Sequence, residues 1–273
     1  MDWHERLSAL RCARKMNTAE EAERARALLS ISTNMEAAVA DARLVIEAIV
    51  EDLAVKQELF ARLDTLLPPE VPICSNTSGL RITEISAKCC HAERTVTTHF
   101  WLPAHLVPLV EVVMGDRTSI ELAQQIVCEL KRWQKSPVLV KRDLPGQLAN
   151  RIFQAIIREA VDIVSSGLAS AEDVDTAISC GMAMRFPEWG PLKHLDAIGL
   201  ELGLKVQDSV LPDICNEKKA GNYLRQLVEK GDTGVKAGKG FYDWSQRDIQ
   251  EDMSKRDLFI MEAVKVTKRL ENH

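Results

Sequence analysis

The chain has 273 residues, of which 46% are hydrophobic and 27% are charged. This length allows one large domain or two ordinary ones, and the composition is typical of a globular protein with a sizeable core. The formal net charge of −5 argues against nucleic-acid binding, because neutralising phosphates requires clustered Lys and Arg. The sequence also has no apolar run of membrane-spanning length, so we expect neither nucleic acid nor membrane as a partner.

The seven cysteines are an odd number and lack the spacing of a disulfide framework. We recognise no secretory segment ahead of them, so reduced thiols in the cytoplasm are the simplest expectation. Cys89 and Cys90 are adjacent, without the two-residue gap that lets both sulfurs face one ion, and no metal site is predicted.

The first part of the chain alternates between helical and strand patterns. A helix is expected within residues 1–16, and Thr18 and Glu21 form a capping box that predicts a second helix to about Leu29. Nearly unbroken apolar runs then indicate strands buried on both faces of a parallel sheet. The expected strands are 43–50, 71–76, 94–100, 109–114 and 137–142, and the expected helices are 52–67, 82–88 and 118–133, the last capped by Thr118 with Glu121.

The strand signals stop near residue 143, and helical patterns follow to the end of the chain. We therefore predict an α/β layered-sheet domain over residues 1–142 and an all-α domain over residues 143–273. Apolar positions between 147 and 215 suggest that the second domain forms a homodimer.

Four polar side chains are expected at the cleft between these domains. Ser78 and His99 follow successive strand ends, Glu111 lies within the next strand, and Asn150 lies at the start of the helical part. Ligands of open α/β sheets bind outside the carboxyl ends of the strands. The four side chains therefore outline a candidate ligand site.

These residues suit proton abstraction from an alcohol. A neutral His99 can take a hydroxyl proton if its other ring nitrogen donates to a fixed acceptor, and Glu111 is the obvious acceptor. Ser78 and Asn150 can then hydrogen-bond the oxygen as it becomes a carbonyl. The alternative is a histidine satisfied within the core and a glutamate that serves only as its ion-pair partner.

Several stretches in order resemble signature blocks of the 3-hydroxyacyl-CoA dehydrogenase family. They are "ARLVIEAIVEDLAVKQELFARLD", "SNTSGLRITEI", "HFWLPAHLVPLVEVV", "DLPGQLANRI" and, near the C-terminus, "GKGFYDW". The resemblance implies an incomplete Rossmann-type parallel sheet domain followed by an all-α domain that dimerises. It also implies an NAD-dependent oxidoreductase of fatty acid metabolism that acts on a small molecule, an acyl-CoA or a hydroxy acid.

The resemblance also implies roles for individual residues. His99 matches the catalytic base and Glu111 its carboxylate partner, while Ser78 and Asn150 match the residues that hold the substrate oxygen. The positions that match cofactor-lining residues are Glu51, Lys56, Ser78 and Lys236.

One departure concerns the phosphate-binding turn. The family opens with a strand, a G-x-G-x-x-G turn and a helix beneath the pyrophosphate, and this sequence contains no such motif. In the family's strand order the strand at 44–50 then has an unpaired edge, which is an aggregation hazard unless it is covered. We expect that the N-terminal helices cover this edge or that the chain is a shortened product.

Two further departures concern the substrate. Leu102 stands where the family has Asn, and "GMAMRFPEWGPL" (181–192) replaces the usual "NHPMGPL". An arginine there resembles the L-gulonate (lambda-crystallin) and carnitine dehydrogenases, so Arg185 could pair with a substrate carboxylate. The alternative is a surface or interdomain salt bridge.

The sequence therefore leaves two hypotheses open, which belong to different functional classes. The first is NAD-dependent oxidation of the 3-hydroxy group of a 3-hydroxyacyl-CoA or a small 3-hydroxy acid. The second is an inactive or cofactor-poor homologue or fragment with a binding or structural role, favoured by the missing turn.

Overall fold

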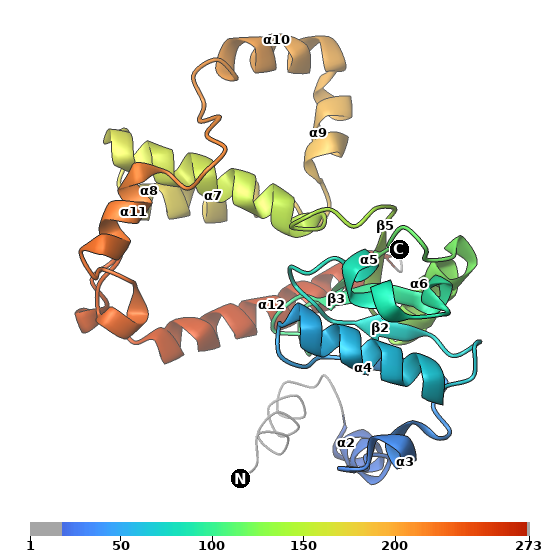
Figure 1. The fold of residues 1–273 in the computed structure, drawn as a ribbon. Helices are drawn as coiled ribbons and strands as arrows, with labels where there is room; N and C mark the ends of the chain where they lie inside the picture. The colour runs from blue at the N-terminus through green and yellow to red at the C-terminus, as the bar shows by residue number, and fades with distance from the viewer. Residues whose placement is uncertain (1–17, 272–273) are drawn as a thin grey trace.

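The computed structural model describes residues 18–271, so the helix expected within residues 1–16 lies outside the described residues. A five-stranded sheet occupies the first part of the chain and helices occupy the rest (Figure 1). The strands follow the order β1-β2-β3-β4-β5, with bounds Val45–Glu47, Ile73–Ser75, Thr95–Phe100, Leu109–Val113 and Ser136–Val140. The expected α/β sheet with a helical C-terminal region is confirmed.

The sheet is parallel except at one junction. β1 pairs with β2, β2 with β3, and β4 with β5 in parallel, whereas β3 and β4 form an antiparallel pair. The expected parallel sheet is thus mainly parallel. The short 101–108 connection explains the one antiparallel pair, because parallel neighbours need a long crossover. The antiparallel register sets His99 directly opposite Glu111.

Helices cover both faces of the sheet. The helices around the sheet are α4 (Leu53–Leu66), α5 (Ile82–Ile85) and α6 (Ile120–Arg132), with 3-10 turns at Ser86–Lys88 and Ala92–Arg94. Successive β2 residues enter opposite cores: Ile73 packs with Phe60 of α4, and Cys74 belongs to the cluster that includes Ile126 of α6. This alternation explains why the strand is apolar at every position.

β1 lies at one edge of the sheet, as predicted. Among the described strands it pairs with β2 alone. The preceding helix α2 (Ala19–Ala27) starts at the predicted Thr18–Glu21 capping box but has no buried residue. Helix α3 (Met35–Val39) packs Met35 and Val39 against the α4 core instead. Within residues 18–271, α2 therefore does not cover the β1 edge with buried side chains.

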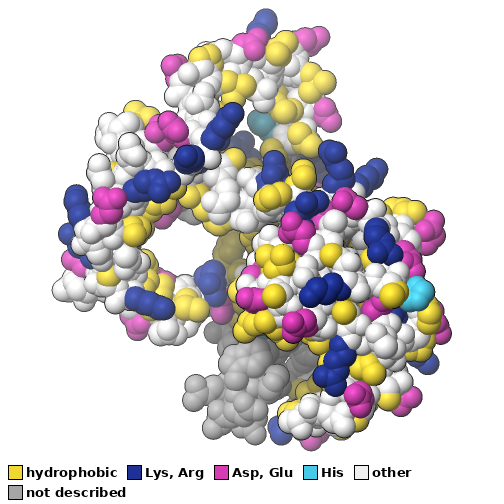
Figure 2. Space-filling model, viewed as in Figure 1, with side chains coloured by type: hydrophobic (Ala, Val, Ile, Leu, Met, Phe, Trp, Pro, Cys, Tyr) yellow, Lys and Arg dark blue, Asp and Glu magenta, His cyan; other side chains and the backbone are white. Residues whose placement is uncertain are grey.

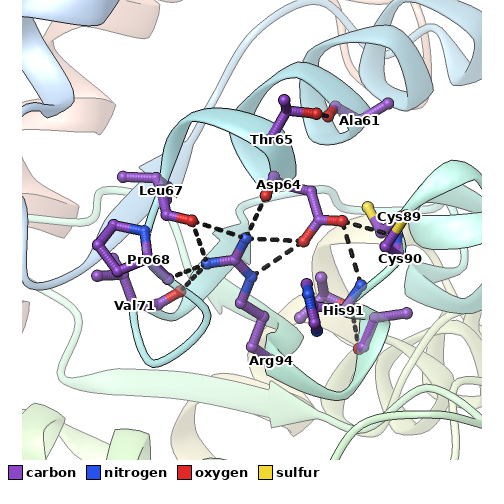
Figure 3. Close-up of polar contacts among 12 residues, drawn as sticks. Ala61, Asp64, Thr65, Leu67, Pro68, Val71, Cys89, Cys90, His91 and Arg94 are labelled. Atoms are coloured by element: carbon purple, nitrogen blue, oxygen red, sulfur yellow. Dashed lines mark hydrogen bonds and ion pairs between the residues drawn. The ribbon is translucent and has the colours of Figure 1, made fainter.

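An ion pair fastens the start of β3 to the end of α4 (Figure 3). The Arg94 guanidinium donates to the Asp64 carboxylate, at 2.8 Å and 3.0 Å, and to carbonyls of the α4–β2 connection. Burial alone would raise the pKa of Asp64, but Arg94 and the amides of His91 and Cys90 hold it below its usual value. This cluster anchors the start of β3, the strand that carries His99.

One local prediction was wrong in detail. Thr118 does not cap α6, because its hydroxyl donates to Thr95 O, and Ser119 accepts from Leu122 N instead. The helical pattern that follows residue 190 is interrupted at Gly199, which adopts φ +91°. Glycine adopts this left-handed backbone at little cost.

The helical region surrounds an opening that is also visible in the space-filling view (Figures 1 and 2). Its helices are α7 (Ala149–Ser166), α8 (Ala171–Thr176), α9 (Pro191–Ile198), α10 (Leu200–Val210), α11 (Asn222–Glu229) and α12 (Ile249–Glu271), with a π-helical turn at Ala177–Met182 and 3-10 turns at Val235–Ala237 and Trp244–Gln246. α9 and α10 project from the body (Figure 1). Among residues 18–271, no helix is both long and apolar enough to cross a membrane.

Candidate functional site

The site is built around the cross-strand pair of His99 and Glu111. Val96 of β3 and Val112 of β4 pack beneath α6, so the alternation of side chains turns His99 and Glu111 to the opposite face of the sheet. His99 Nδ1 lies 2.9 Å from Glu111 Oε2. The glutamate side chain is fully buried, while 12% of the histidine side chain remains exposed.

The Glu111 carboxylate is held by four donors. Its Oε2 also accepts from Trp101 Nε1, and its Oε1 accepts from the amides of Leu148 and Ala149, each at 2.8 Å. Burial alone would raise the pKa of Glu111, but the bonds from His99, Trp101 and the two amides lower it to about 2. Glu111 is therefore ionised at neutral pH.

Glu111 also acts as the cap of α7. The N-cap residue Leu148 provides no side-chain hydrogen bond. The backbone amides of Leu148 and Ala149 donate to Glu111 instead. Free amides at a helix start carry partial positive charge and stabilise an anion. One carboxylate thus joins the sheet to the helical region.

The ionised Glu111 determines which nitrogen of His99 can act as a base. A carboxylate only accepts hydrogen bonds, so Nδ1 carries the proton of a neutral imidazole. Nε2 is then left with a free lone pair. In this arrangement Nε2 could accept a proton.

The loop after β2 is organised by Asn76 and Glu51. Asn76 Oδ1 accepts from Phe100 N at the end of β3, at 2.9 Å. Glu51 Oε1 accepts from Thr77 Oγ1 (2.6 Å) and from the amides of Ser78 (3.1 Å) and Gly79. The polar run after β2 thus holds the loop beside β3 and leaves Ser78 exposed.

Gln147 connects this loop to the start of α7. Its Nε2 donates to Thr77 O at 3.1 Å, and three residues later in the chain comes Asn150. The Asn150 side chain is half-buried, and its Oδ1 lies 3.3 Å from Gln154 Nε2. The Ser78 loop, the His99–Glu111 pair and the Asn150 helix start are therefore linked by direct contacts or by adjacency in the chain.

Three other predicted site residues are placed differently. The Lys56 side chain is 1% exposed, and its Nζ lies 2.6 Å from Glu47 Oε1 and 3.4 Å from Glu51 Oε2. Arg185 is exposed in the segment between α8 and α9, and Lys236 is exposed in the turn after α11. Among the described residues, no recorded contact joins Arg185 or Lys236 to His99, and their roles stay predictions.

The residues present fit one end of NAD. The Glu51 side chain is 44% exposed at the carboxyl end of the β1 segment, and the exposed Ser78 follows β2. This acceptor and this hydroxyl suit the hydroxyl and amide groups of the nicotinamide and its ribose. The sequence provides no G-x-G-x-x-G turn, so we assign the pyrophosphate to none of its residues.

Sequence reasoning missed two residues of this site. Trp101 contacts Glu111 across the hairpin, and buried Gln147 adopts φ +52° with its Oε1 unpaired among the described residues. Trp101 could have been found from the period of two, because it follows His99 by two residues. Nothing in the sequence pattern indicated Gln147.

Comparisons with known proteins show the family of the chain. Residues 3–144 match the family model "3-hydroxyacyl-CoA dehydrogenase, NAD binding domain", and residues 146–244 match "3-hydroxyacyl-CoA dehydrogenase, C-terminal domain". A probable 3-hydroxybutyryl-CoA dehydrogenase of Bacillus subtilis is 37% identical over 80% of this chain and 75% of that protein.

A second similarity is found both to a protein sequence and to a crystal structure of an enzyme with the same name. The 5-formyl-3-hydroxy-2-methylpyridine 4-carboxylate 5-dehydrogenase of Mesorhizobium japonicum is 32% identical, and the match spans 75% of this chain and 66% of that protein. A crystal structure of an enzyme of that name, described as an NAD+ dependent dismutase, superposes with a TM-score of 0.81 at 28% identity, covering 87% of this chain and 77% of the other. The chain belongs to the 3-hydroxyacyl-CoA dehydrogenase family.

Proposed function

We propose that the protein catalyses NAD-dependent oxidation of the 3-hydroxy group of a 3-hydroxyacyl-CoA or a small 3-hydroxy acid. The observation that carries this proposal is the His99–Glu111 pair, with Nδ1 2.9 Å from a buried carboxylate and Nε2 left to act as base. The family relationship supports an oxidoreductase that uses NAD.

In this proposal the protein residues handle the proton and the substrate oxygen. The hydroxyl proton moves to His99 Nε2 as the carbon–oxygen double bond forms, and Glu111 stabilises the imidazolium that results. Ser78 and Asn150 donate hydrogen bonds to the oxygen as it becomes a carbonyl. NAD, when bound, supplies the acceptor for the hydride that leaves the same carbon.

The cofactor contacts are part of the proposal. Glu51 and Ser78 bind the nicotinamide and its ribose, Lys56 holds Glu51 in place from its buried position, and Lys236 reaches the cofactor from the helical domain. We assign residues 1–142 to the cofactor-binding domain and residues 143–273 to the helical substrate and dimerisation domain.

Arg185 is proposed to select a substrate with a carboxylate. Its guanidinium can form two parallel hydrogen bonds to a carboxylate, which a thioester does not offer. The Mesorhizobium relative is named as a pyridine carboxylate dehydrogenase, which supports a small acid among the substrates.

The proposed assembly is a cytoplasmic homodimer formed through the helical domain. The arm made by α9 and α10 carries Leu200 (63% exposed), Leu202 (52%) and Leu204 (61%), and hydrophobic atoms gather on it in Figure 2. Exposed apolar patches of this kind mark interaction surfaces. A second copy that covers the arm would double the mass measured by light scattering.

The proposed activity is tested by His99→Gln. The variant should reduce NADH formation from 3-hydroxybutyryl-CoA by about 10²–10⁴-fold, because it removes the general base. The matched control is His91→Gln, since His91 forms an exposed pair with Glu93 at 3.1 Å and should leave the rate unchanged. A His99→Gln rate equal to that of the wild type would remove the base assignment.

The alternative is an inactive or cofactor-poor homologue or fragment with a binding or structural role. The observation that favours it is the buried Lys56, whose ammonium group is already paired with Glu47. Calorimetric titration with NADH separates the two functions. Binding at micromolar concentration supports the dehydrogenase, and the absence of detectable heat supports the alternative.

A further inference from the structure

Trp101 contacts the same carboxylate oxygen as the proposed base. Its backbone amide continues the β3–β4 pairing through Leu109 O, at 3.5 Å, and its position two residues after His99 puts both side chains on one face. Its Nε1 lies 2.8 Å from Glu111 Oε2, which also lies 2.9 Å from His99 Nδ1. The two ring centroids are 6.1 Å apart.

We propose that Trp101 is a positioning residue of the His99–Glu111 pair: its indole N–H shares Glu111 Oε2 with His99 Nδ1 and so limits how strongly that oxygen can favour a protonated ring. This inference rests on the proposed function. An indole N–H that donates to the shared oxygen reduces the negative charge available there, so the oxygen stabilises an imidazolium less. Without it, the carboxylate would favour the protonated ring more strongly.

The other oxygen of Glu111 is held by backbone donors. Glu111 Oε1 is occupied by the amides of Leu148 and Ala149, so the carboxylate stays in place when the indole is changed. Among the described residues, the hydrogen bonds recorded to Glu111 come from those amides, His99 and Trp101. Of the cations beside β3, Arg94 is paired with Asp64 at the start of the strand, and Lys135 Nζ lies 5.8 Å from the ring centroid of Phe100 and donates to Val107 O.

The test compares the wild type with Trp101→Phe, which keeps an aromatic ring and loses the N–H. The acid limb of kcat/KM against pH should move by about half a pH unit to higher pH, with KM unchanged on the plateau. The matched control is Trp133→Phe, since Trp133 Nε1 donates to Glu129 on the surface of α6 at 3.1 Å, and its profile should stay in place. An unmoved limb, or an equal loss of rate at every pH, would overturn the inference.

A second measurement does not depend on turnover. ¹⁵N NMR of the His99 ring in the free protein, assigned with His99→Gln, follows protonation directly. Replacing Trp101 by benzothienylalanine, which has the shape of tryptophan without the N–H, should move the ring titration to higher pH. An unmoved titration overturns the role of Trp101 even in an active enzyme. A moved titration in a protein without turnover supports that role and removes the proposed function instead.

Discussion

At the scale of single residues, Glu111 has three tasks. It orients His99, accepts from Trp101, and caps α7 through the amides of Leu148 and Ala149. All three need the ionised carboxylate. Burial of the side chain would raise the pKa of Glu111, but the hydrogen bonds from these donors lower it to about 2. A buried carboxylate without such donors would be protonated at neutral pH.

Replacing Glu111 by Gln should change the stability of the protein in a pH-dependent way. The folded pKa of Glu111 is lower than the unfolded value, so its ionisation stabilises the fold above the unfolded pKa. This contribution is lost as the pH falls through the folded value. At pH 7 the variant should lose about 2–3 kcal/mol in unfolding free energy, and the deficit should shrink between about pH 5 and pH 2.

Denaturant unfolding across this pH range measures the difference. Glu129→Gln is the control, because Glu129 accepts from Trp133 in an exposed counterpart of the Glu111–Trp101 pair. A Glu111→Gln deficit that is constant with pH would show that the loss comes from packing and not from the carboxylate charge.

At the scale of elements, the candidate site depends on the position of β3. The Asp64–Arg94 pair fixes the strand at its start, and the Asn76 side chain fixes it at Phe100 near its end (Figure 3 for the ion pair). His99 lies just before that second anchor. The strand is thus held before its first residue and at its last residue, and the pairs that align it with β4 lie in this span.

Asp64→Asn should therefore destabilise the protein strongly. It leaves the buried Arg94 guanidinium without its counter-charge, and breaking a buried pair costs about 3–5 kcal/mol. The control is Glu36→Gln, which removes an exposed ion pair to Arg62 on the same helix α4 and should cost less than about 1 kcal/mol. Equal unfolding free energies for the two variants would contradict the anchoring role of Asp64.

The elements were largely predictable because the sheet is buried on both faces, which leaves a clear apolar signal in each strand. The Thr18 cap was predicted correctly, whereas Ser119 and not Thr118 caps α6, because the Thr118 hydroxyl donates to Thr95 O. Contacts of this kind join residues far apart in the chain, and no local spacing encodes them. The same reason hid the bond from the Leu148 amide to Glu111.

At the scale of the molecule, the site lies where the sheet meets the helical region. Glu111 of β4 binds the first turn of α7, and Gln147 binds the loop after β2. A substrate held between Ser78 and Asn150 would therefore contact both parts of the chain. The central claim is that its 3-oxygen lies against His99 in this position.

A crystal structure of the protein with NAD and a 3-ketoacyl-CoA product tests this claim most directly. We predict the 3-keto oxygen within about 3 Å of His99 Nε2, with Ser78 and Asn150 as its other hydrogen-bond partners. The claim would be contradicted if the ligand bound with that oxygen turned away from His99, or if the His99–Glu111 pair were broken in the complex.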